Sequence, residues 1–117
     1  MNKLVLLIIG LVLVSGCKKE TQQPFVCSTG VSYTSHARAI LDAHCATGGC
    51  HTAPFPAGGI YLSDYANAKA QVLGDDLMCS IKQEVNCTPM PYPLGTPPLS
   101  DSLISILVCW RNNGCPQ

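Results

Sequence analysis

The chain is poor in charge and in aromatic rings. Of its 117 residues, seven are Lys or Arg and seven are Asp or Glu, and aromatic residues make up 6% with a single Trp. No cluster of basic side chains occurs, so nucleic acid is not expected as a partner. A formal charge this close to zero also excludes strong electrostatic steering of a charged partner. No internal repeat or low-complexity run is present.

Long hydrophobic runs are also lacking. The longest apolar stretch extends from Leu4 to Val14 and is interrupted only by Gly10. A helix that spans a membrane needs roughly 20 apolar residues, about twice the length of this stretch. A short apolar run after a charged start is instead typical of the central region of a signal peptide. We therefore expect residues 1–16 to be a signal peptide rather than part of the fold.

The end of this segment resembles the lipobox of bacterial lipoproteins, since small residues lead directly into Cys17. The resemblance implies that Cys17 becomes the acylated first residue of the mature chain; an ordinary secretory signal with an unrelated cysteine is the alternative. Residues 17–25 are expected to form a flexible tether, and residues 26–117 one small domain. The product would be anchored by lipid to a bacterial membrane, with the outer membrane favoured, and its domain would lie in the periplasm or on the cell surface.

The most informative motif is Cys45-Ala46-Thr47-Gly48-Gly49-Cys50-His51. Two cysteines with a histidine directly after the second are typical of covalent haem attachment, in which the imidazole becomes an axial iron ligand. The usual spacer has two residues, whereas this one has four, and Gly48 and Gly49 would allow it to bulge. Two other interpretations stay open: a Cys45–Cys50 disulfide in a cofactor-free binding or structural lipoprotein, and a zinc site. Zinc is disfavoured because an adjacent Cys and His rarely reach one tetrahedral ion together.

Eight cysteines in an exported chain indicate an oxidising compartment in which disulfides persist. A domain of this size buries only about 60–65% of the surface that its unfolded chain exposes, so it benefits from cross-links or a cofactor. With Cys17 assigned to lipid and the motif pair to haem, five cysteines remain: Cys27, Cys79, Cys87, Cys109 and Cys115. An odd number allows two bridges at most and leaves one thiol.

Apolar periodicity predicts an all-α fold with long Gly/Pro-rich loops. The expected helices cover residues 34 to about 43 after a Ser32 or Thr34 cap, 63–74 with Ser63 as cap, 76–82, and a last helix that Ser100 caps and Gly114 ends. Residues 86–98 contain five prolines and are expected to be neither helix nor central strand.

A second axial ligand would have to come from Met78, Met90, His36 or His44. Met90 is favoured because prolines on both sides stiffen the loop that carries it and bias it toward extended geometry. Met78 lies in an apolar run, where methionine commonly fills core gaps. The two histidines fit better as ordinary residues of the first helix.

Together these features resemble a class I cytochrome c domain over residues 31–117. The most specific motifs are Cys50-His51, Met90-Pro91, and Leu99-Ser100-Asp101 leading to Cys109-Trp110-Arg111-Asn112-Asn113-Gly114. The resemblance implies that the first and last helices cross and pack. It also implies one haem c attached to Cys45 and Cys50, with His51 as the proximal ligand and Met90, or alternatively Met78, as the distal one.

The function that this resemblance implies is one-electron transfer by a monomer that meets redox partner proteins in the cell envelope. No catalytic residues are expected, and a haem peroxidase with an open distal position is the alternative. An apolar shell of Ile40, Leu41, Tyr65, Leu103 and Leu107 would surround the ring. A Cys79–Cys87 bridge would brace the methionine loop, and Cys27 could reach Cys109 or Cys115 across the packed helices, with Cys87–Cys109 as a competing pairing.

Overall fold

The computed structural model describes residues 26–93 and 95–117, so the expected signal peptide (1–16) and tether (17–25) lie outside the described residues. Across these two ranges the chain forms helices and loops and no strand, which confirms the all-α class. The elements are η1 (Tyr33–Ala37), α1 (Arg38–His44), η2 (Ala57–Gly59), α2 (Tyr65–Leu73), α3 (Asp75–Ile81) and α4 (Asp101–Asn112). None of the described helices is long and apolar enough to cross a membrane.

The first helix begins as a turn of π-helix, η1, and continues as α1. The Ala37 amide donates to the Ser32 carbonyl five residues earlier at 3.2 Å, and the His36 amide shares that acceptor at 3.1 Å. Ser32 also caps this helix, because its hydroxyl accepts the Ser35 amide at 3.3 Å. The predicted helix over 34–43 is therefore present, with a π-turn that apolar periodicity does not reveal.

One predicted N-cap, Ser63, is wrong, and a second, Ser100, occupies the predicted position without making a capping bond. Helix α2 is capped by Asp64 rather than Ser63: Asp64 has extended backbone angles, and its carboxylate accepts the Asn67 amide at 2.9 Å. Ser100 precedes α4, but its hydroxyl lies 3.0 Å from that of Ser102 and makes no capping bond to the helix. Asp101 still places a negative charge in the first turn of α4, where the helix dipole favours it.

The core joins η1, α2 and α4 through three aromatic rings. The Tyr33 ring centroid lies 5.3 Å from that of Tyr65 and 5.7 Å from that of Trp110, distances at which tilted rings attract one another. Trp110 and Leu107 on α4 are fully buried. The first and last helical segments thus pack against each other, as expected.

The residues after α4 complete this core. The Pro116 carbonyl accepts hydrogen bonds from the Trp110 indole N–H at 2.8 Å and from the Tyr33 amide at 2.9 Å. The Tyr65 hydroxyl donates to the Cys115 carbonyl at 2.9 Å. Three helical segments therefore bind the same two consecutive carbonyl groups.

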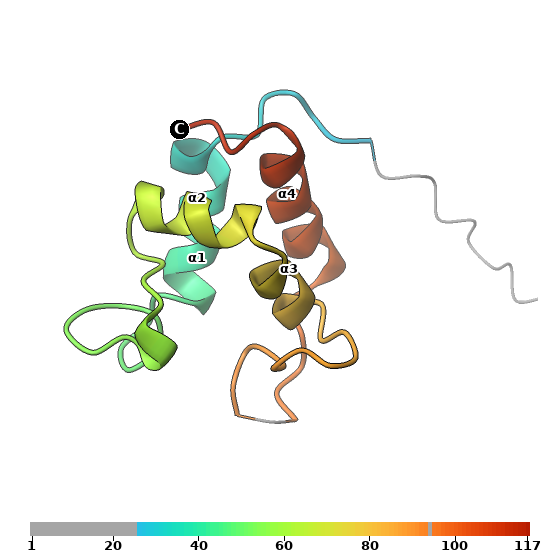
Figure 1. Ribbon diagram of the computed structural model, residues 1–117. Helices are drawn as coiled ribbons and strands as arrows, with labels where there is room; N and C mark the ends of the chain where they lie inside the picture. The colour runs from blue at the N-terminus through green and yellow to red at the C-terminus, as the bar shows by residue number, and fades with distance from the viewer. Residues whose placement is uncertain (1–25, 94) are drawn as a thin grey trace, which may run out of the picture.

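Two long loops lie at the end of the molecule away from this aromatic cluster and from the C-terminus (Figure 1). One follows α1 and contains the Cys45–His51 motif and η2. The other, between α3 and α4, is the proline-rich segment, which has neither helix nor strand among its described residues. Helices α2 and α3 are connected at Gly74 and lie between the two loops.

Candidate functional site

A cavity of about 620 Å³ opens between the two loops. This volume is in the range of protein sites for small molecules and cofactors. Most of its lining is apolar and comes from both loops and from α3: Ala43, Ala57, Ile60, Leu62, Leu77, Ile81, Pro91 and Leu99. It is the site at which this fold can enclose a flat, largely hydrophobic ligand.

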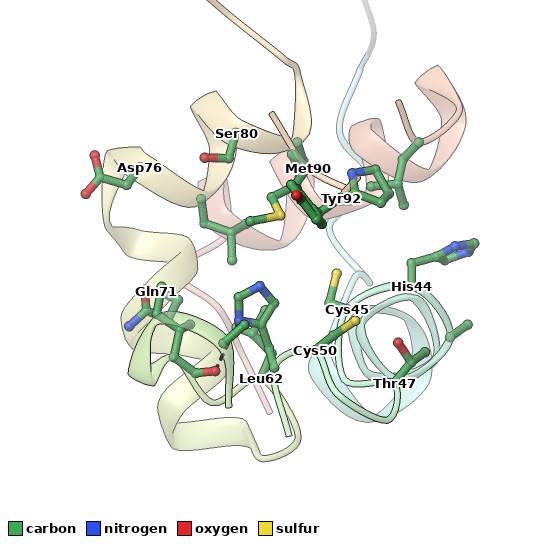
Figure 2. A pocket seen from close by; sticks show the side chains of 18 of the residues that line it. His44, Cys45, Thr47, Cys50, Leu62, Gln71, Asp76, Ser80, Met90 and Tyr92 are labelled. Atoms are coloured by element: carbon green, nitrogen blue, oxygen red, sulfur yellow. Dashed lines mark hydrogen bonds between the residues drawn. The ribbon is translucent and has the colours of Figure 1, made fainter. Parts of the chain in front are cut away.

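All four residues that the sequence assigned to haem line this one cavity: Cys45, Cys50, His51 and Met90. In Figure 2 the sulfur atoms of Cys45 and Cys50 lie close together and point into the cavity, and Met90 lies on the opposite side with its sulfur directed inward. The motif and the methionine loop are therefore brought together across a common space, although about 40 residues of sequence separate them.

The His51 ring is held by a backbone carbonyl. Its Nδ1 atom lies 3.2 Å from the Ile60 carbonyl oxygen, so Nδ1 carries the proton and donates it. This contact leaves Nε2 as the ring nitrogen available to bind a metal. A second contact, from the Leu62 amide to the His51 carbonyl at 2.9 Å, fixes the backbone of the same residue.

The four-residue spacer forms a compact turn. The Cys50 amide donates to the Thr47 carbonyl at 2.9 Å, and the His51 amide returns to the Cys45 carbonyl at 3.0 Å. Gly49 has a φ of 82°, a left-handed angle that residues with a side chain rarely adopt. The expected bulge is thus built from backbone hydrogen bonds and one glycine.

The two motif cysteines are half-buried and are not bonded to each other. Burial, with a smaller contribution from Cys50, raises the pKa of the Cys45 thiol to about 11. Cys45 is therefore a neutral thiol near pH 7, and a thiol is a much weaker nucleophile than a thiolate. Burial in this environment therefore lowers the reactivity of the Cys45 sulfur.

The alternative axial ligands are placed differently. Met78 is 3% exposed inside the core and does not line the cavity. His36 accepts the Ser32 amide on its Nδ1 at 3.4 Å and lies outside the cavity lining. His44 lines the rim, but its ring points away from the cavity in Figure 2. Of the four candidates, Met90 alone presents its side chain to the cavity.

The predicted apolar shell needs correction. None of its five members lines the cavity: Ile40, Leu41, Tyr65, Leu103 and Leu107. They belong to the core or pack against it instead. The positions were inferred from helical stripes, and those stripes face the helix–helix core, whereas the cavity is lined by loop residues and by another side of α3.

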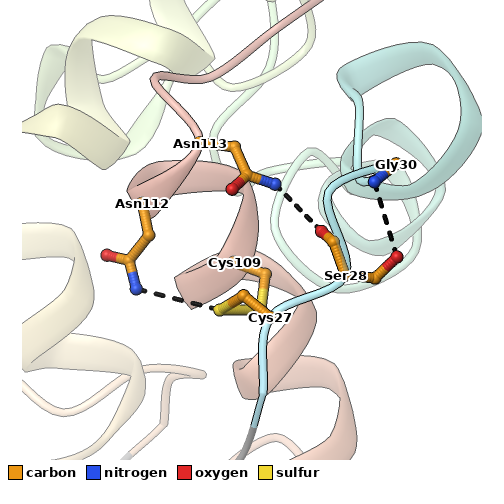
Figure 3. The surroundings of a disulfide bond; sticks show 6 residues. All are labelled: Cys27, Ser28, Gly30, Cys109, Asn112 and Asn113. Carbon is orange, nitrogen blue, oxygen red and sulfur yellow. Dashed lines mark hydrogen bonds between the residues drawn. A yellow bond between two sulfur atoms is a disulfide. The ribbon is translucent and has the colours of Figure 1, made fainter.

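Two disulfides are present in the described part of the chain, Cys27–Cys109 and Cys79–Cys87. The first joins the segment before η1 to α4, next to hydrogen bonds from Asn113 to the Ser28 carbonyl at 3.0 Å and from Asn112 to the Cys27 sulfur (Figure 3). The competing pairings Cys27–Cys115 and Cys87–Cys109 do not form. Cys115 is the remaining thiol and is fully buried.

Sequence reasoning missed two contributors to the site. The Ile60 carbonyl that orients His51 is a backbone group and has no residue-type signature. Gln83 also went unnoticed: its side-chain amide donates to the carbonyls of Met90 at 3.3 Å and Thr96 at 3.1 Å. A lone polar residue after a short helix gives no signal for such a role.

Comparisons with protein-family models, with curated proteins and with solved structures found no match to this chain.

Proposed function

We propose that this protein is a monohaem c-type cytochrome with a class I-like fold, a lipid-anchored one-electron carrier of the bacterial cell envelope. Cys45 and Cys50 would hold the haem through thioethers, His51 would be the proximal ligand and Met90 the distal ligand. The cofactor would supply one-electron chemistry between Fe(III) and Fe(II).

The observation that carries the proposal is the shared cavity. Cys45, Cys50, His51 and Met90 come from two distant segments, yet all of them line one largely apolar space of suitable size. The Nδ1 contact of His51 with the Ile60 carbonyl adds independent support, because it selects the tautomer that an iron ligand needs. The two thiols are also free, as covalent attachment requires.

The residues of the chain have separable roles in this proposal. The half-buried thiols would fix the orientation of the ring, and the Ile60 carbonyl would hold the His51 imidazole toward it. Met90 would favour the ferrous state, since a thioether ligand raises the potential relative to a second histidine. The apolar lining from Ile60, Leu62 and Leu77 would exclude water from the ring face.

The test is expression of the full-length chain in a bacterial host that has haem-maturation machinery. We expect a coloured protein with a sharp reduced α band and an intact mass, after denaturation, that includes one haem. The matched control is the double variant Cys45→Ser/Cys50→Ser, which should lose the covalent haem mass.

The opposing result is a colourless wild-type protein, from the same host, in which Cys45 and Cys50 are joined to each other. That outcome would favour the cofactor-free lipoprotein. Peroxidase activity that survives replacement of Met90 and exceeds that of free haem at the same concentration would favour an open distal position instead.

A further inference from the structure

We propose that Gln83 is a positioning residue for the methionine loop: its side-chain amide clamps residues 90–96 and thereby holds the Met90 thioether at the cavity. This role rests on the proposed function of Met90 as distal ligand. Gln83 itself would touch neither iron nor ring, because it does not line the cavity.

The clamp is a single amide group with two acceptors. Gln83 Nε2 donates to the Met90 carbonyl at 3.3 Å and to the Thr96 carbonyl at 3.1 Å. Each side-chain amide nitrogen has two hydrogens, so both bonds can form at once. One side chain therefore bonds both to Met90 and to Thr96, two residues of the loop between α3 and α4.

The backbones of Gln83 and Met90 are both hydrogen-bonded to the C-terminal end of α3. The backbone amides of Gln83 and Met90 both donate to the Ser80 carbonyl, each at 3.1 Å. The Cys79–Cys87 disulfide closes the intervening segment next to this point. Gln83 therefore projects from a fixed position, and Met90 is held by one bond through its amide and another through its carbonyl.

The backbone of Gln83 makes the role testable. Its φ is 53°, in the left-handed region that glycine adopts freely and other residues adopt at a cost. Glycine would fit the backbone conformation at position 83 better than glutamine, because it has no Cβ atom to clash at a positive φ. Replacement by glycine therefore removes the Gln83 side chain without adding backbone strain at this position.

The test uses Gln83→Gly in the full-length, haem-loaded protein. We expect a modest fall in melting temperature, because two hydrogen bonds are lost while glycine relieves the left-handed backbone angle. Imidazole, which must displace Met90 to reach ferric iron, should bind about tenfold more tightly, since the two lost hydrogen bonds hold the loop. A purely structural role for Gln83 predicts the same fall in melting temperature with unchanged imidazole affinity.

The matched control is Asn86→Gly. Asn86 also has a left-handed φ, 73°, on the same segment, and its exposed side chain makes no hydrogen bond in the described structure. This variant should leave imidazole affinity at the wild-type value. Equal affinity in wild type, Gln83→Gly and Asn86→Gly, with Met90 ligation intact, would overturn the clamp.

A chain that takes up no haem would contradict the proposed function, and the clamp can then be tested on its own. Amide hydrogen exchange of residues 90–96 in the haem-free protein should be faster in Gln83→Gly than in Asn86→Gly or wild type. Exchange at the same rate in all three would overturn the clamp regardless of the cofactor.

Discussion

The orientation of the His51 ring depends on a backbone carbonyl group and not on a reactive side chain. The Ile60 carbonyl accepts from Nδ1 at 3.2 Å and so decides which ring nitrogen faces the cavity. Ile60 reaches this place because the loop after the motif turns back through η2, where Gly58 and Gly59 both have positive φ angles. Gly58 and Gly59 thus allow the turn after which the Ile60 carbonyl meets the His51 ring.

At the same scale, the two methionines of the domain lie in different places: Met90 lines the cavity and Met78 is buried in the core. Their replacement should therefore affect the haem spectrum differently. Replacement of Met90 by leucine keeps a similar volume but removes the sulfur from the cavity. The absorption spectrum of the haem-loaded protein should change from low-spin to high-spin, with a lower potential.

The control for this prediction is Met78→Leu. Met78 is buried in the core, so the swap should cost less than about 1.5 kcal/mol of stability and leave the spectrum unchanged. A high-spin spectrum in Met78→Leu, together with a normal one in Met90→Leu, would transfer the distal role to Met78.

Asp64 gives the clearest pH dependence. Hydrogen bonds from the Asn67 amide and the Asn67 side chain to its carboxylate lower the pKa of this group below its usual 3.8. The cap is therefore fully present above pH 3.8 and is lost as the pH falls through the lowered value. Stability measured between pH 5 and 2 should fall less steeply in Asp64→Asn, which retains a capping oxygen but does not titrate in this range. Equal slopes for the two proteins would show that the cap does not contribute to acid sensitivity.

At the scale of elements, α2 and α4 are joined through the residues that follow α4. Tyr65 on α2 donates its hydroxyl to the Cys115 carbonyl, and Trp110 on α4 donates to the next carbonyl along the chain. The C-terminal residues therefore link the two helices in addition to the hydrogen bond that Arg111 on α4 donates to the Leu73 carbonyl at the end of α2, 3.3 Å away.

This link can be measured with a pair of tyrosine variants. Tyr65→Phe removes the hydroxyl and leaves the Cys115 carbonyl without its donor, so the free energy of unfolding should fall by about 1–2 kcal/mol in urea titrations. Tyr61→Phe removes a hydroxyl from an exposed ring and should change it by less than about 0.5 kcal/mol. Equal losses would indicate that the Tyr65 bond is not stabilising.

Helices were predictable from sequence, whereas their exact caps and the cavity wall were not. The predicted stripe of the first helix comprises Ala37, Ile40, Leu41 and His44. The three apolar members are buried, because a buried face needs apolar side chains at helical spacing, whereas His44 is exposed. Asp64 and Ser63 are adjacent residues that both cap well, and only the backbone angles decide between them. The cavity wall comes from loops, whose course depends on tertiary contacts rather than on a repeating pattern. Hence the motif cysteines and Met90 could be identified, but Ile60, Leu62 and Leu77 could not.

At the scale of the whole molecule, the two disulfides close loops of very different length. Cys27–Cys109 closes a loop of 82 residues and Cys79–Cys87 one of eight. In the chain-entropy model the first stabilises the fold by about 4–5 kcal/mol and the second by about 2–3 kcal/mol. One bridge therefore constrains the entire domain, and the other constrains the base of the methionine loop.

Paired replacement should separate these two effects. Cys27→Ser/Cys109→Ser should show the larger drop in thermal stability and an unchanged spectrum of the haem-loaded protein. Cys79→Ser/Cys87→Ser should lose less stability but bind imidazole more tightly, because it loosens the segment that ends at Met90. The reverse pattern in calorimetry and ligand titration would contradict this division of roles.

The Cys27–Cys109 bridge also determines which part of the domain receives a pulling force applied to the chain before Cys27. Cys27 lies at the start of the described chain, and the bridge fastens it covalently to the helix that forms the centre of the core. If the chain is anchored at Cys17 as proposed, a pull on the upstream segment would pass through the bridge to α4. The load would then reach the core directly and would not have to be transmitted along the backbone from Cys27 to the Cys45–His51 motif.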